Sequence, residues 1–196
     1  AVLHELRTSI ENLYSGWFMP QLGAAWVKVV EGDQGLLQRW AIPDVTPQQA
    51  FYEREVQPLY SGGAKRVFVV ISDALRYEVA QELVQFTNGK NRFKASLGAM
   101  LGVLPSYTAL GMAALLPHQT LAYKESANLD VLADGQPVST LEQRNAHLAT
   151  YEGLAIKADE LLALGKDKGR ALVRDRRVIY VYHDHIDALG DKQATE

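Results

Sequence analysis

The pattern of apolar and polar positions is clearest between residues 65 and 83. Residues 67–71 are five consecutive apolar residues, four of them β-branched, which predicts a strand buried on both faces, as in a parallel sheet. The run ends at Ser72-Asp73, and residues 74–83 then follow the pattern of an amphipathic helix. Asp73 therefore lies at the carboxyl end of a buried strand, where open α/β sheets bind ligands. The alternative is that Asp73 only caps the helix.

Further strands are predicted downstream, with helices between them. Residues 93–100 form the second predicted strand, residues 153–156 a brief one, and residues 178–182 the last clear one. A short apolar helix over residues 109–116 follows the stretch Pro105-Ser106-Tyr107-Thr108. Strands alternating with helices predict an α/β fold with a mostly parallel central sheet flanked by helices.

Two shorter patterns concern the later helices. Ser139 or Thr140, followed by Gln143, resembles a capping box for a helix that runs to residue 149. Residues 165–169 are charged and flanked by glycine, which predicts a break between elements.

The first 60 residues are predicted to form a helical N-terminal region or appendage. Helical spacing begins at Leu3 and continues to Trp17, and Pro20 is expected to end or kink that run. Because this region lacks clustered acidic or imidazole groups, we expect its three Trp residues to serve packing and not catalysis. The predicted organisation is therefore residues 1–60 and residues 61–196.

Composition narrows the functional classes. The chain has 196 residues, 47% of them hydrophobic and 22% charged, which is typical of a soluble globular protein. It has no Cys, so thiolate metal sites and disulfides are excluded. No apolar stretch is long enough to span a membrane and no signal peptide is visible, so we expect a cytoplasmic protein without membrane partners. The chain begins with Ala1 and stops at Glu196, so we expect it to be a fragment.

Candidate chemistry falls at strand ends and helix starts. Asp73, the Ser106 and Thr108 hydroxyls, and the imidazole-carboxylate segment 183–191 are expected to meet, because the carboxyl ends of parallel strands share one edge of a sheet. Oxygen and imidazole donors suit Zn, Mn or Mg, and a helix start favours an anion. Together they indicate phosphoryl or sulfuryl transfer. The alternatives are that the hydroxyls only cap a helix, and that His183 and His185 face opposite sides of a strand.

Three ordered motifs resemble the PglZ domain, which belongs to the alkaline phosphatase superfamily and is associated with bacteriophage exclusion (BREX) defence systems. They read SDALRYEVA at 72–80, LPSYTALGMAALLPH at 104–118 and YVYHDHIDALGD at 180–191. The resemblance covers roughly residues 50 to 196. It implies a mostly parallel sheet with a two-metal site at the strand ends, of which this chain would carry only part.

The resemblance also implies roles for particular residues. Asp73 matches a carboxylate metal ligand, and Thr108 matches a hydroxyl nucleophile that also ligates one metal. Asp187 resembles a ligand of the other metal, and Asp191 stands where the superfamily usually has His. His183, Asp184, His185 and Ser106 would support the ligands from beside them.

The leading interpretation is therefore part of a metal-dependent phosphohydrolase that acts on a phosphodiester or phosphomonoester. The resemblance implies two divalent metal ions, other proteins of the defence system as partners, and a nucleic acid or nucleotide as a substrate class. The alternative is a non-catalytic scaffold or assembly module of the defence complex. A nucleotide-binding Rossmann module is disfavoured, because no glycine-rich loop follows the first strand.

Overall fold

The structure, a computed structural model, describes residues 2–32, 36–90, 92–124 and 130–193. It divides into two compact units, an N-terminal unit of residues 1–45 and a main unit of residues 46–196. The domain boundary at residue 60, which the sequence suggests, stays a prediction. Among the described residues, no helix is both long enough and apolar enough to cross a membrane.

The N-terminal unit is helical, as expected. It contains α1 (Val2–Leu13), a π-helical turn (Tyr14–Phe18), α2 (Met19–Gly32) and α3 (Leu36–Arg39). The expected end or kink at Pro20 is wrong as an end, because α2 continues through this residue. A proline ring inside a helix normally clashes with the carbonyl four residues earlier, which here is that of Gly16. Because Gly16 lies in the π-helical turn, which is wider than an α-helix, the helix can continue past Pro20. The sequence Gly-Asp-Gln-Gly at residues 32–35 predicts a turn, and residues 33–35 lie outside the described residues.

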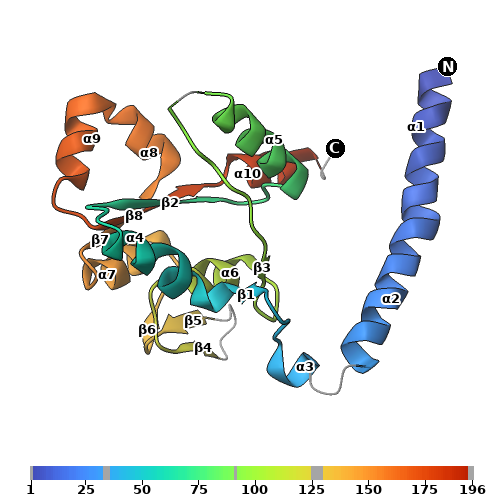
Figure 1. Cartoon of the computed structure of the whole chain (residues 1–196), viewed down its shortest axis with the longest axis horizontal. Helices are drawn as coiled ribbons and strands as arrows, with labels where there is room; N and C mark the ends of the chain where they lie inside the picture. Colours follow the sequence, from blue (N-terminus) through green and yellow to red (C-terminus); the bar gives the residue numbers. More distant parts are fainter. Residues whose placement is uncertain (1, 33–35, 91, 125–129, 194–196) are drawn as a thin grey trace. The chain divides into compact units, whose positions relative to one another are not determined.

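A parallel three-stranded sheet organises the main unit (Figure 1). Its order is β2 (Val67–Ser72), β8 (Val178–His183) and β7 (Gly153–Lys157). Val67 is opposite Val178, and Ser72 is opposite His183, so β2 and β8 end together. The structure confirms the strands predicted at these three places. It also confirms the α/β fold, in which helices surround a parallel sheet.

The two faces of this sheet carry two apolar clusters. On one face, Val69 and Tyr180 pack with Leu110 and Ala113 of α6 (Thr108–Ala114) in the larger cluster. On the other face, Ile179 and Val181 pack with residues of α8 (Ala158–Ala163) and α9 (Gly165–Val173). The predicted break at residues 165–169 is wrong, because these residues open α9, with Gly165 at φ 68°.

The second predicted strand, residues 93–100, is also largely wrong. Only β3 (Met100–Leu101) is a strand, and it pairs in parallel with β1 (Thr46–Pro47). Residues 94–99 carry no regular secondary structure, although the chain leads from α5 (Tyr77–Asn88) to β3 through them.

The remaining elements of the main unit surround the sheet (Figure 1). They are a 3₁₀ turn (Gln48–Ala50), a π-helical turn (Tyr52–Val56), α4 (Gln57–Ser61), the antiparallel strands β4 (Leu121–Lys124), β5 (Asp130–Ala133) and β6 (Gln136–Pro137), α7 (Leu141–Ala149) and α10 (His185–Gln193). The predicted capping box of α7 is confirmed: Thr140 Oγ1 accepts from the Gln143 N–H, and the Gln143 side chain accepts from the Thr140 N–H.

Candidate functional site

Asp73 directly follows β2 and is tied to the end of β8. Its backbone N–H donates to the carbonyl of His183 at 2.9 Å, so the two strand ends stay in register for one residue beyond β2. Its carboxylate accepts a hydrogen bond from the N–H of Ala74 at 3.0 Å. Ala74 has a φ of 60°, a conformation uncommon for a residue with a side chain.

The interpretation of Asp73 as only a helix cap is wrong. The following helix, α5, begins at Tyr77, and its N-cap residue is Arg76, which makes no side-chain capping bond. The left-handed turn at Ala74 separates Asp73 from the helix. Its carboxylate, half-buried, therefore stands at the strand end without a capping role.

Two imidazoles lie at the end of β8. His183 is the last residue of that strand, and its Nδ1 lies 2.9 Å from the Ser72 hydroxyl of β2, which fixes the orientation of the ring. His185 begins α10, and its ring centroid is 6.3 Å from that of His183. The expectation that these two side chains face opposite sides of a strand is wrong, because the strand ends between them and α10 turns His185 back.

Carboxylates of α10 gather beside Asp73. The pKa of the Asp187 carboxyl is raised, first by the negative charge of Asp73, then by partial desolvation and by the charges of Asp191 and Asp184. A charge raises the pKa of a carboxyl in this way only where it lies close to that carboxyl. The charges of Asp73, of Asp191 on α10 and of Asp184, just before that helix, therefore lie near Asp187, as we expected for Asp73 and Asp187.

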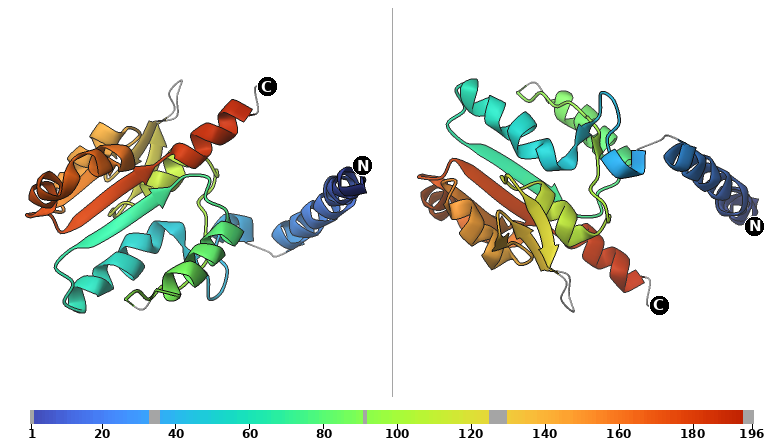
Figure 2. Two further views of the ribbon diagram at one scale, coloured as in Figure 1. Left: turned by 90° about the horizontal axis from the view of Figure 1, so that it is seen from above. Right: turned by 90° about the horizontal axis from the view of Figure 1, so that it is seen from below.

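Thr108 is the first residue of α6 and is exposed. Its predecessor Tyr107 is the N-cap residue, and the helix has no side-chain capping bond, so the interpretation of Thr108 as a cap is wrong. Ser106 is also exposed, in the loop before α6. The helix lies close to the carboxyl ends of β2 and β8 in both views of Figure 2.

Gln48 was not anticipated from the sequence. Its side-chain amide donates to the Gly111 carbonyl of α6 at 3.0 Å, and its side-chain oxygen accepts from the N–H of Val103 at 3.2 Å. One side chain therefore holds both flanks of the loop that carries Ser106 and leads to Thr108. A lone Gln has no local sequence signal, because both its partners lie more than 50 residues away.

The sheet edge is suited to a divalent cation but does not form a complete site. Carboxylate oxygens and imidazole are the donors that such cations take in proteins. Within the described part of the chain, however, there is no group of three or more His, Asp or Glu side chains arranged to hold a metal ion. Asp73 and Asp187 can therefore supply part of a ligand set.

Comparisons with known proteins find relatives over the part of the chain that holds these residues. The profile of the BREX system PglZ alkaline phosphatase-like domain matches residues 51–196. Alkaline phosphatase-like protein BrxZ of Escherichia coli O9:H4 (strain HS) is 47% identical over 196 residues, which cover 100% of this chain and 22% of that protein. Alkaline phosphatase-like protein PglZ of Bacillus cereus (strain H3081.97) is 39% identical over 193 residues, which cover 97% of this chain and 22% of that protein. No solved structure matches the chain.

Proposed function

This chain belongs to the PglZ alkaline phosphatase-like domain family of BREX systems, and from that premise we propose that it carries part of the active site of a metal-dependent phosphohydrolase. The substrate is a phosphodiester or a phosphomonoester. The observation that supports this most strongly is the meeting of Asp73 and Asp187, whose mutual repulsion raises the pKa of Asp187.

The carboxylates of Asp73 and Asp187 are the proposed metal ligands. The nearby negative charge of Asp73 disfavours the ionised form of Asp187, and divalent cations held by these carboxylates would reverse that effect. Two ions of Zn, Mn or Mg, with Thr108 and Asp191 as further ligands, are the proposed cofactors. Bound there, they would supply Lewis acidity to a phosphoryl oxygen.

The remaining residues position these groups. The Thr108 hydroxyl is the proposed nucleophile, and Gln48 holds the loop and helix that present it. Ser72 fixes the ring of His183, and His183, His185 and Asp184 are proposed to accept or donate hydrogen bonds beside the ligands. Ser106 is proposed to contact the substrate from the same loop as Thr108.

A non-catalytic scaffold or assembly module of the defence complex is the second candidate. The observation that favours it is that the described residues hold no group of three metal-binding side chains. Both candidates share the proposed partners, which are other proteins of the defence system, and the proposed substrate class of the enzyme is a nucleic acid or nucleotide.

Replacing Thr108 tests the enzymatic proposal. In a polypeptide of the relatives' full length, Thr108→Ala should lower phosphoesterase activity by at least about a hundredfold, because a nucleophile is lost. The matched control is Thr120→Ala, directly before β4, which removes another exposed threonine hydroxyl, one that donates to the Asp134 carboxylate. Thermal midpoints measured on the same preparations separate catalysis from stability. Undiminished hydrolysis in folded Thr108→Ala protein would favour the scaffold.

A further inference from the structure

The amino ends of the parallel strands meet at the edge of the sheet opposite to Asp73. Arg66 directly precedes β2, and Arg177 directly precedes β8. Both strands have six residues, and a strand rises about 3.3 Å per residue, so this amino edge lies roughly 20 Å from the carboxyl ends of β2 and β8. A site at the amino edge is therefore separate from the candidate active site.

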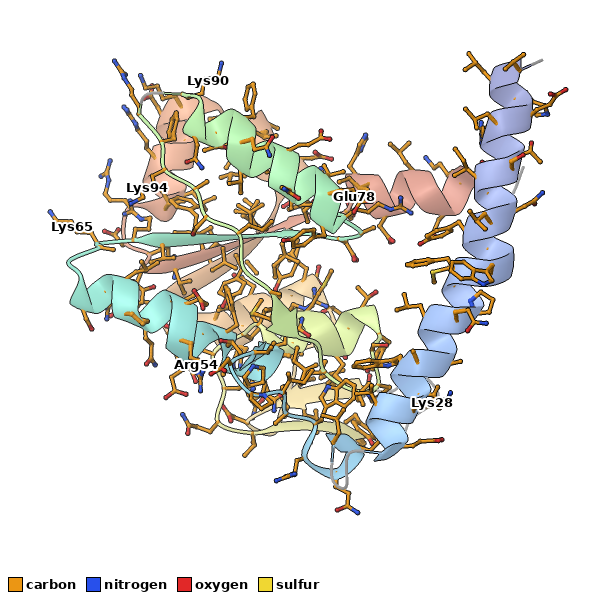
Figure 3. The ribbon with its side chains drawn as sticks, turned by 45° about the vertical axis from the view of Figure 1, so that its right-hand side comes forward. Lys28, Arg54, Lys65, Glu78, Lys90 and Lys94 are labelled. Carbon is orange, nitrogen blue, oxygen red and sulfur yellow. The ribbon has the colours of Figure 1, made fainter. Side chains whose placement is uncertain are left out.

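Basic side chains are concentrated at the amino edge. The guanidinium of Arg66 donates to the carbonyl of Arg176 at 3.0 Å and to that of Arg174 at 2.6 Å, so the residues before β2 and β8 are held together. Lys65 is exposed, and Figure 3 shows its side chain extending from the start of β2. Residues 165–177 contain six Lys or Arg residues and two Asp residues, in a chain whose formal net charge is −3.

Helix α9 extends these cations in a row. Lys166, Arg170 and Arg174 follow one another at intervals of four residues, which places them on one side of the helix and its C-cap, and all three are exposed. Within the described part of the chain, the only ion pair of the amino edge joins Arg177 to Glu152 at 3.9 Å, and both side chains are more than half exposed. A row of cations with few carboxylates beside it attracts an extended anion.

Aromatic side chains line a cavity beside the same cations. The cavity has a volume of about 340 Å³, and its lining includes Tyr52, Tyr60, Tyr151 and Arg177. The guanidinium of Arg177 lies over the ring of Tyr60, 4.6 Å from its centroid, and the rings of Tyr52 and Tyr151 meet edge to face. Burial raises the pKa of Tyr60 to about 12, so its hydroxyl stays neutral beside an anion. Flat rings and guanidinium planes are the surfaces on which unpaired bases stack.

A second cavity continues the first. It has a volume of about 200 Å³ and shares Tyr52, Gln57 and Tyr151 with it. Gln49 and Gln119 add further side-chain amides to the lining. Because an amide carries both a donor and an acceptor, it can match the polar edge of a base. The two cavities thus combine stacking surfaces with hydrogen-bonding groups.

The cations and the cavities lie on two faces of the sheet and meet at its amino edge. Val173 of α9 packs on one face, and Tyr60 packs on the other. Arg66 reaches the Arg174 carbonyl beyond α9, and Arg177 lies over the ring of Tyr60. These two side chains therefore join the two faces. A single strand is flexible enough to follow this turn, whereas a duplex is stiff over such a distance.

We propose that the amino edge of the sheet binds single-stranded nucleic acid. The row of cations on α9, together with Lys65, holds the phosphates, and bases enter the tyrosine-lined cavity beside Arg177. A duplex fits the cations but not the cavity, because its bases are stacked inside the double helix. An acidic protein segment would pair with the cations but supplies few flat polar rings for the cavity. Because this binding does not depend on hydrolysis, it holds for an enzyme and for a scaffold alike.

Fluorescence anisotropy with a labelled oligothymidylate of about 16 nucleotides tests this binding. The protein is a polypeptide of the relatives' full length, in chelator, so that the strand is not hydrolysed. Arg170→Gln/Arg174→Gln should weaken binding at least about tenfold at low salt. It should also reduce the slope of log affinity against log salt concentration by about 1.4, because two phosphate contacts are lost. The matched control, Lys28→Gln/Lys124→Gln, removes two exposed charges from α2 and β4 and should leave affinity and slope unchanged.

An abasic strand of the same length tests the part of the cavity. The oligothymidylate should bind at least about tenfold more tightly than the abasic strand, because its bases stack on the tyrosines. Tyr151→Ala should remove most of that difference and leave the affinity for the abasic strand unchanged. Equal affinity of the unmodified protein for the two strands would overturn the proposal, because the cavity would then accept no base.

Two other results would also overturn the proposal. An equal loss of affinity in the Lys28→Gln/Lys124→Gln control would mean that only net charge attracts the strand. Equally strong binding of polyglutamate would make an acidic protein the partner. Hydrolysis is a separate matter, since Thr108→Ala should bind the oligothymidylate as tightly as the unmodified protein does. A protein that binds the strand at the amino edge but hydrolyses no phosphoester with metal present would contradict only the enzymatic proposal.

Discussion

Two buried tyrosines on β8 give a matched pair of hydroxyl deletions. Tyr180 is 0% exposed, and its hydroxyl donates to the carbonyl of Leu115, just beyond α6, at 2.6 Å. Tyr182 is on the same face and 8% exposed; its buried hydroxyl makes no hydrogen bond within 3.5 Å among the described residues, although the Arg144 side chain lies near enough to oppose the rise in its pKa that burial causes. The Arg144 guanidinium lies over the ring of Tyr182, 5.0 Å from its centroid.

The two Tyr→Phe variants should therefore behave differently. In Tyr180→Phe, the part-buried Leu115 carbonyl loses its donor, which should lower the free energy of unfolding by about 1.5 kcal/mol. For a chain of this size, that loss corresponds to a thermal midpoint lower by about 3–6 °C. Tyr182→Phe removes a hydroxyl that makes no hydrogen bond within 3.5 Å and keeps the ring under Arg144. The free energy of unfolding should therefore change by no more than about 0.5 kcal/mol.

Urea unfolding of both variants beside the unmodified chain measures this difference directly. Equal destabilisation by the two substitutions would refute the reasoning, because it would mean that the hydroxyl bonded to Leu115 contributes no more than the hydroxyl of Tyr182. The result also concerns the site, since this bond is one of the contacts that hold α6, and with it Thr108, against the sheet.

Three further predictions concern the elements around the site. Gln48→Ala should reduce phosphoesterase activity of the longer polypeptide more than Gln49→Ala does, because only Gln48 holds the loop before α6; an equal effect would remove Gln48 from the account. Thr140→Ala should cost about 1 kcal/mol in urea unfolding, because it removes the capping box of α7, and no cost would contradict that role. Desolvation alone would raise the pKa of Asp134, but hydrogen bonds from the N–H groups of Thr120 and Gln119 outweigh it and hold that pKa below its ordinary value of 3.8. Its folded-state pKa is thus the lower one, so the stabilisation is present above about pH 4 and is lost as the pH falls further; Asp134→Asn should flatten that acid limb of a pH-stability curve, and an unchanged limb would count against it.

The sequence predicted the parts of the fold that local pattern controls. The apolar runs of β2 and β8 and the Thr140 capping box needed no knowledge of distant residues. Residues 94–99 have a strand-like pattern but no regular structure, because a strand also requires a partner, which pattern does not supply. The start of α5 was placed too early, because the left-handed backbone at Ala74 has no signature in a residue that favours helices.

For the candidate site, too, local pattern predicted some features, and others depend on tertiary structure. The shared edge of parallel strands led to the expectation that Asp73 and Asp187 lie close together, and the raised pKa of Asp187 beside the charge of Asp73 agrees with it. His183 and His185 were misplaced because the change from strand to helix falls between them, within a single residue. Gln48 was missed because its contacts to Val103 and Gly111 depend entirely on tertiary structure.

The central claim is that Asp73 and Asp187 are ligands of divalent cations, and Mn²⁺ binding measured by electron paramagnetic resonance tests it most directly. In a polypeptide of the relatives' full length, Asp73→Asn and Asp187→Asn should each weaken Mn²⁺ binding by at least about tenfold, because each removes a charged ligand. Glu78→Gln is the matched control, since it neutralises an exposed carboxylate on α5 that forms an ion pair with Arg76. Unchanged Mn²⁺ affinity in both Asp variants, or an equal loss in Glu78→Gln, would contradict the claim.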